Sequence, residues 1–104
     1  MEENRKTFEE QYPDIAHAQH ALAKACDGWG SLDEKTRQLI KIAFATALGS
    51  ENAVKAHVAK AQAMGIEPEA IQHTILLGLP ALGYPRSVAA LAWANPMLGA
   101  PGLR

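Results

Sequence analysis

Apolar residues recur every three or four positions along most of the chain, the spacing of helices with one buried face. The clearest case is residues 50–65, SENAVKAHVAKAQAMG. Ser50 can accept a hydrogen bond from a free N–H of the first turn, and Gly65 can supply the left-handed residue that closes the helix. One arc of this helix carries Ala53, His57, Ala61 and Met64, with Val54 and Val58 at its edge. His57 is therefore predicted to point toward the interior.

The same patterns predict about six helices and an all-α fold. Capping-box sequences begin at Thr7 and Ser31, and prolines that suit a first helical turn stand at 13, 68 and 85. Alternating β-branched residues and Asn-Gly or Asp-Gly turns are nearly absent, so strands are not expected. The expected helices are residues 7–12, 13–26, 32–48, 50–65, 68–79 and 85–95.

Helical spacing also selects the side chains expected to face the core. In residues 13–26 these are Ile15, Ala18, Leu22 and Cys26, and in residues 32–48 they are Leu39, Ile40, Ala43, Phe44 and Ala47. Trp29 is expected to plug the core, whereas His17 and His20 are expected to face solvent. Residues 68–79 are apolar nearly all round, which predicts a subunit interface. For His73, exposure, an interface and a pocket lining stay open.

Composition narrows the class of protein. The chain has 104 residues, 48% hydrophobic and 20% charged, which is typical of one folded domain. Its net charge of −1 argues against nonspecific nucleic-acid binding, and no apolar run is long enough to span a membrane. The first ten residues, MEENRKTFEE, lack the apolar core of a signal peptide. The single cysteine, Cys26, fits a reducing compartment, so we expect a cytoplasmic protein.

The residues alone give little specific chemistry. There is no glycine-rich phosphate loop and no Ser-His-Asp arrangement recognisable by spacing. His57 and His73 lie 16 residues apart without a nearby carboxylate pair, so neither a metal site nor a cofactor is expected. A buried histidine needs partners for its ring nitrogens, and these partners set its pKa. A structural core histidine and a functional one are both compatible with this pattern.

Five segments carry a family resemblance through their order and spacing. They are FEEQYPDI at 8–15, LDEKTRQLIKIAFA at 32–45, KAHVAKAQAMG at 55–65, PEAIQHTIL at 68–76, and Gly-Tyr-Pro at 83–85 followed by ALAW at 90–93. Together they resemble the carboxymuconolactone decarboxylase family, which includes the alkylhydroperoxidase D-like proteins. The resemblance implies a single domain over residues 1–104, a helical bundle of that fold, and a homo-oligomer, either a trimer or a hexamer.

The redox branch of that family has a Cys-x-x-Cys pair followed by a histidine. The resemblance places this histidine at His57 and the two cysteines at Ser50 and Ala53, so both thiols are missing. A glutamate that relays protons in that branch is replaced here by Gln38. Peroxide reduction needs one thiolate to attack and a second thiol to resolve, so we disfavour a peroxiredoxin-type antioxidant activity.

The decarboxylase branch keeps the histidine and lacks the cysteines, as this chain does. Its members act on a small carboxylated lactone without a cofactor, which implies His57 as acid/base, donating a proton or stabilising the developing charge. Arg37 or Lys41 could hold the carboxylate, and His73 replaces a residue that is often acidic. The favoured hypothesis is thus a cofactor-free lyase or isomerase. The alternatives are a non-catalytic oligomeric binding or scaffold protein, and a redox protein that uses Cys26.

Overall fold

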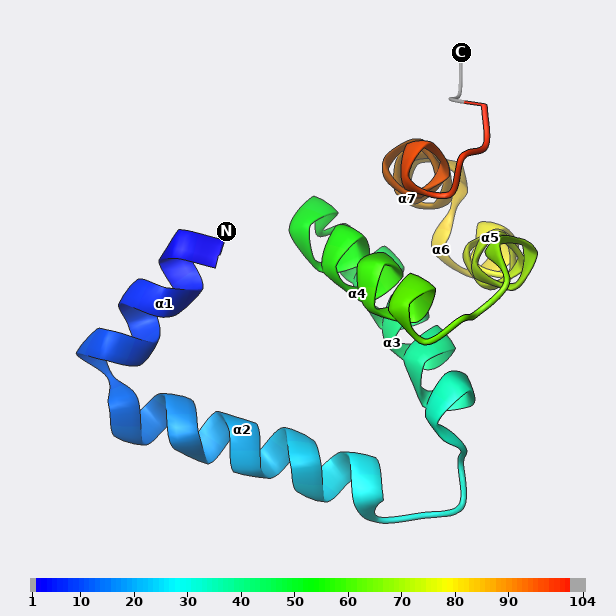
Figure 1. Ribbon diagram of the computed structural model, residues 1–104. Helices are drawn as coiled ribbons and strands as arrows, with labels where there is room; N and C mark the ends of the chain where they lie inside the picture. The colour runs from blue at the N-terminus through cyan, green and yellow to red at the C-terminus, as the bar shows by residue number, and fades with distance from the viewer. Residues whose placement is uncertain (1, 102–104) are drawn as a thin grey trace. The chain divides into compact units, whose positions relative to one another are not determined.

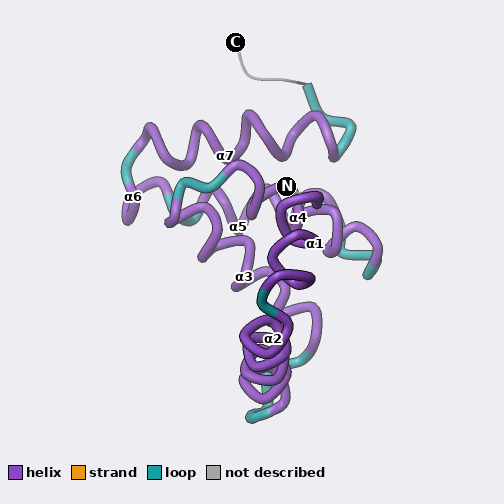
Figure 2. Tube along the Cα trace, turned by 90° about the vertical axis from the view of Figure 1, so that its left-hand side faces the viewer, coloured by secondary structure: helices purple, strands orange, loops and turns teal. Residues whose placement is uncertain are grey.

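The computed structural model describes residues 2–101, and within them it contains helices, turns and no strand (Figures 1 and 2). The all-α prediction is therefore confirmed. The helices are α1 (Glu2–Gln11), α2 (Pro13–Gly28), α3 (Glu34–Leu48), α4 (Glu51–Ala63), α5 (Pro68–Leu76), α6 (Leu79–Leu82) and α7 (Tyr84–Met97). No helix in the described part of the chain is both long and apolar enough to cross a membrane.

The chain divides into two compact units, of which the first ends at Leu32 and the second begins at Asp33. The first unit is the helix pair α1 and α2. Thr7 lies inside α1, so the capping box predicted there is wrong, because the helix begins five residues earlier. Ala16 is the one buried residue among those described in this unit. Two helices cover only one side of each other, so a small side chain at their contact is all that they bury.

The large apolar side chains of the first unit are exposed, against the prediction. Ile15 and Leu22 are 60% and 58% exposed, and Cys26 is exposed as well. Trp29 is 90% exposed, so it does not plug the core. The helical spacing of these residues was recognised correctly, but within this unit nothing covers the apolar side of α2. His17 and His20 are exposed, as predicted.

The second unit contains the core. Helices α3 and α4 form an antiparallel hairpin, and α5 and α7 pack against both of them (Figure 1). Gly49 makes the turn of the hairpin with a φ of 68°, and the Nη1 of Arg86 donates a 2.6 Å hydrogen bond to the carbonyl of Ala47 at the end of α3. The core consists of Ile42, Ala45, Val54, Val58, Ala61, Ile66, Ile71, Ile75, Ala90 and Ala94.

Polar side chains cap the N-terminal ends of the hairpin helices. Ser50 begins α4 as predicted, and its Oγ accepts from the N–H of Ala53 at 3.2 Å. Helix α3 begins at Glu34 and is capped by Asp33, whose carboxylate accepts from the N–H of Thr36 at 2.8 Å. The cap predicted at Ser31 is therefore wrong by two residues. The hydrogen bond from the Thr36 backbone lowers the pKa of Asp33.

The covered face of α3 differs from the predicted one. The residues of α3 that are buried are Gln38, Ile42, Ala45 and Thr46. Leu39, Ile40 and Ala43 are only partly buried, whereas Phe44 and Ala47 are exposed. Helix α3 has apolar side chains on two sides, and its neighbours in this unit cover the side that carries Ile42 rather than the side that carries Phe44.

The helix predicted over residues 68–79 is two helices with a break at Leu77 and Gly78. Pro80 explains the break, because its ring lacks an N–H and would clash with the carbonyl four residues earlier in a continuous helix. Gly78 also sits where chains approach closely, since an added Cβ would lie 3.1 Å from the Ile75 carbonyl and 3.2 Å from the Ser87 Oγ. The break turns the chain toward α7.

Candidate functional site

The hairpin of α3 and α4 brings Gln38 and His57 together, two residues that lie 19 positions apart in the chain. Gln38 is 3% exposed, and its amide Nε2 donates a 2.9 Å hydrogen bond to the backbone carbonyl of His57. The same nitrogen lies 3.4 Å from the ring Nδ1 of His57. The side chain at the place of the family's relay glutamate thus contacts the candidate histidine directly.

His57 lies at the edge of the covered face of α4. The buried residues of this helix are Val54, Val58 and Ala61, while His57 is partly buried. The predicted arc is therefore rotated, because α4 is packed by α3 on one side and α7 on another, which places the two valines at its centre. An imidazole at such an edge combines apolar surroundings with access from outside the chain.

The surroundings of His57 favour its neutral form. Partial burial lowers the pKa of the ring, because removing water disfavours the imidazolium. The positive charges of Lys41 on α3 and Lys60 on α4 lower it further. The neutral imidazole is thus the favoured form of the ring at neutral pH. It can accept or donate a hydrogen bond, and the two positive charges favour an anion in its surroundings.

The places of the missing cysteines have structural roles or no reactive group. The hydroxyl of Ser50 accepts the capping hydrogen bond from Ala53, and Ala53 offers only a methyl group. Cys26, the single thiol of the sequence, belongs to α2 of the first unit. Within the second unit, therefore, no thiol accompanies His57.

His73 does not join this site. It lies on α5 and is exposed in the single chain, so exposure and a place at a subunit interface both stay open for it. Among the described residues, no group of three or more histidine, cysteine, aspartate or glutamate side chains could hold a metal ion. The chemistry that the structure assembles around Gln38 is therefore that of amide, imidazole and ammonium groups.

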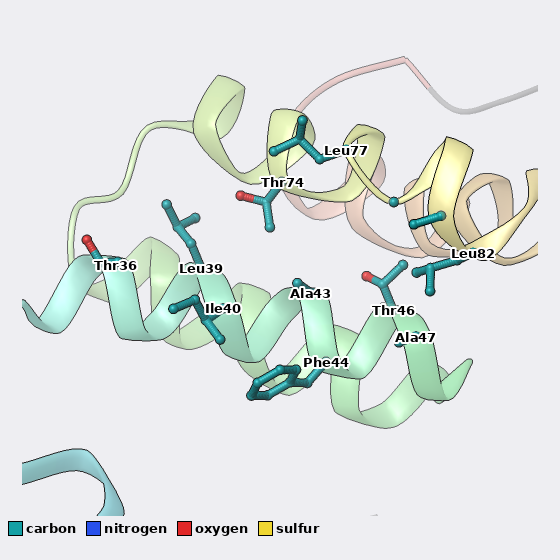
Figure 3. Close-up of a pocket in the computed structure, with 12 residues that line it drawn as sticks. Thr36, Leu39, Ile40, Ala43, Phe44, Thr46, Ala47, Thr74, Leu77 and Leu82 are labelled. Atoms are coloured by element: carbon teal, nitrogen blue, oxygen red, sulfur yellow. The ribbon is translucent and has the colours of Figure 1, made fainter. Parts of the chain in front are cut away.

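A second feature is an apolar groove on the opposite side of α3, with a volume of about 430 Å³ (Figure 3). Thr74 of α5 points toward α3 across it, Leu77 lies at the residue after α5, and Leu82 lies near one end. The ring of Phe44 projects from the side of α3 away from α5 and is 63% exposed. All twelve residues that line the groove are uncharged: Thr36, Leu39, Ile40, Ala43, Phe44, Thr46, Ala47, Thr74, Leu77, Gly78, Ala81 and Leu82.

Sequence reasoning missed two of these features. Lys60, exposed on α4, was given no role, although its position three residues after His57 puts it one turn away. The groove was missed because its residues were assigned to the core. Lys41 was considered only as a carboxylate ligand, and its spacing of three residues from Gln38 could have indicated the same site.

The fold and this pair of side chains define a class of protein, an all-helical bundle with a candidate acid/base histidine between two packed helices. A comparison of the sequence with models of protein families then identifies the family of the chain. The model of the carboxymuconolactone decarboxylase family matches residues 13–96. The chain therefore belongs to this family, and the resemblance to it is confirmed. No curated protein matches the chain.

Proposed function

We propose that the protein is a cofactor-free lyase or isomerase that acts on a small carboxylated compound, with His57 as its acid/base group. Membership of the carboxymuconolactone decarboxylase family supports this class of reaction. The observation that carries the proposal is the partly buried His57, which accepts a hydrogen bond from Gln38 at its backbone carbonyl and whose ring pKa is lowered by burial and by the charges of Lys41 and Lys60. A histidine that serves only to fill the core needs no access and no neighbouring cations.

For a carboxylated lactone the reaction is a decarboxylation. The bond between the ring carbon and the carboxylate carbon breaks, carbon dioxide leaves, and the electron pair stays on the lactone as a dienolate. One proton then adds to a ring carbon, which gives the enol-lactone. The barrier falls when the dienolate is stabilised as it forms, and an imidazole N–H that donates to the dienolate oxygen supplies such stabilisation.

The two lysines suit a substrate with negative charge. Lys41 comes from α3 and is partly buried, whereas Lys60 comes from α4 and is exposed. Two positive charges on the helices that carry the candidate site attract a carboxylate, and the attraction is stronger where water is partly excluded. They also favour the dienolate, in which the negative charge is retained after carbon dioxide has left.

A non-catalytic oligomeric member of the family is the second candidate, and the uncovered groove favours it. The groove is apolar and uncharged, and Phe44, Leu77 and Leu82 beside or within it are 63%, 64% and 37% exposed. Exposed apolar surface of this kind is typical of an interface. We propose that the protein is a homo-oligomer, either a trimer or a hexamer, whether it is an enzyme or a non-catalytic member of the family. Assembly alone, however, gives no role to His57 and its neighbours.

Incubation of the protein with carboxymuconolactone in D₂O tests the proposed reaction. We expect release of carbon dioxide above the uncatalysed rate and one deuterium in each molecule of enol-lactone, because the proton that replaces the carboxylate comes from an exchangeable group. A panel of other small carboxylated lactones, tested in the same way, would detect activity if the substrate is another compound of this class. Background rates with the whole panel would favour the non-catalytic candidate.

A further inference from the structure

The contact between Gln38 and His57 fixes the orientation of the Gln38 amide. A backbone carbonyl only accepts hydrogen bonds, so the amide nitrogen of Gln38, and not its oxygen, must face the carbonyl of His57 at 2.9 Å. The same nitrogen lies 3.4 Å from Nδ1 of the ring. An amide nitrogen carries two hydrogens, so it can donate to both atoms at once.

This orientation constrains the proton on the ring. A donor that faces Nδ1 requires a lone pair there, and a neutral imidazole with a lone pair on Nδ1 carries its hydrogen on Nε2. Protonation of the ring would place an N–H of Nδ1 against the N–H of the amide. Because Gln38 is 3% exposed, water cannot easily take its place as a partner.

We propose that Gln38 is a positioning residue that holds His57 as the neutral Nε2–H tautomer, so that the ring meets a substrate as a hydrogen-bond donor through Nε2. The ring then stabilises the developing negative charge without carrying a positive charge beforehand. The tautomer is a property of the free protein, and only its use toward a substrate rests on the proposed function.

The charges around His57 also favour the neutral form of its ring. The positive charges of Lys41 on α3 and Lys60 on α4 lower the pKa of His57, and burial lowers it more than they do. Helices α5 and α7 also pack against α4 and contribute no charge to this effect among the described residues. Gln38 is the group with directional contact to the ring, so it selects which nitrogen keeps the hydrogen, which burial and distant charges cannot do.

Nuclear magnetic resonance of the ¹⁵N-labelled protein, titrated between about pH 5 and 8, tests this directly. Two-bond correlations between the carbon-bound hydrogens of the imidazole and its two ¹⁵N nuclei report which nitrogen carries the proton. The exposed His17 is an internal reference. We expect the wild-type His57 to show the Nε2–H form alone, with a pKa below 6.5. The Nδ1–H form as the main neutral species of His57 would overturn the proposal.

The variant Gln38→Glu replaces the donor by an acceptor of the same shape. We expect it to raise the pKa of His57 by about 1–3 units, because a protonated Nδ1 can donate to the carboxylate. Gln72→Glu is the matched control, since the partly buried amide of Gln72 also donates to an oxygen on a neighbouring helix, the Oδ1 of Asn95 at 3.2 Å. The same His57 pKa in both variants would contradict the proposal.

If Gln38→Glu does not fold, Gln38→Met decides, because methionine has a similar length and no N–H. In this variant we expect the Nδ1–H form of His57 to become measurable. An unchanged tautomer ratio together with an unchanged pKa would show that Gln38 only fills space. These results do not depend on turnover, so they separate a failure of this proposal from a failure of the proposed reaction.

Discussion

The two sides of α3 differ in what covers them and in what they carry. One side includes Ile42 and the polar Gln38, both buried, and the Gln38 amide contacts His57 of α4. The other side carries Phe44 and forms the wall of an apolar groove. The polar residue is thus buried, whereas the large aromatic residue is exposed. Hydrophobicity alone would have given the reverse arrangement.

The difference indicates two separate roles for one helix. A buried amide requires hydrogen-bond partners, and a fixed contact to an imidazole is a reason to keep one in the interior. An exposed phenylalanine beside an apolar groove is costly in water unless another surface covers it. We therefore connect the Gln38 side with chemistry and the Phe44 side with assembly.

The largest effect is expected from shortening an isoleucine on the covered side. Ile42 is fully buried, so Ile42→Ala should lower the free energy of unfolding by about 2–5 kcal/mol. Ile40→Ala is the matched control on the groove side, where the side chain is only partly buried, and it should cost clearly less. Urea denaturation measures both, and equal losses would contradict the assignment of the two sides.

A charge on the groove side should break the assembly while leaving the chain folded. Phe44→Asp places a carboxylate on the rim of the apolar groove, and burying it in an interface would cost several kcal/mol. Light scattering should show an oligomer for the wild type and for the control Ala59→Asp, and the mass of one chain for Phe44→Asp. A wild-type protein that is monomeric at micromolar concentration would refute the expected assembly.

The sequence predicts the elements of the fold well and their covered sides poorly. Ser50, Gly49 and Pro68 mark helix ends through local chemistry, so those ends could be read directly. The exposure of Phe44 could not, because α3 is apolar on two sides and the choice between them depends on where α5 and α7 pack. The break before Pro80 was missed, although the proline itself was the signal.

The candidate site was likewise predicted from the sequence only in part. The family resemblance gave His57 and Gln38, and the hairpin of α3 and α4 brings them into contact. Periodicity alone placed His57 deeper in the interior than it lies. Lys60 is exposed, as its polarity indicates, but its position one turn from His57 also lets its charge lower the pKa of the ring.

A moderate effect is expected at the start of α4. Ser50→Ala removes the acceptor for the N–H of Ala53 and should lower the free energy of unfolding by about 1 kcal/mol. Ser50→Asp restores an acceptor and should recover most of this loss, since aspartate is an equally good cap. Loss of activity in Ser50→Ala without loss of stability would instead give the hydroxyl a chemical role.

The smallest effect is a dependence of stability on pH. Because the folded-state pKa of His57 is below 6.5, the unfolded chain binds the proton more readily. The contribution of neutral His57 is therefore fully present above about pH 6.5 and is lost as the pH falls through the folded-state pKa. Asp33, whose pKa is also lowered, loses its contribution only in the more acidic range of a carboxylate.

Denaturation at pH values on both sides of 6.5 measures this effect. The free energy of unfolding should fall more steeply with acid in the wild type than in His57→Gln, which has no proton to bind. His17→Gln is the control at an exposed position. A wild type that becomes more stable as the pH falls below 6.5 would show that the folded chain favours the imidazolium.

Turnover and thermal unfolding of His57→Gln, measured on one preparation, test the central claim most directly. Glutamine keeps a polar side chain of similar size, so the account predicts a nearly unchanged melting temperature and a loss of about 10²–10⁴ in kcat on the substrate identified from the lactone panel. His73→Gln, at an exposed position on α5, should retain both properties. A lowered melting temperature with unchanged kcat would show that His57 is a structural residue and would contradict the account.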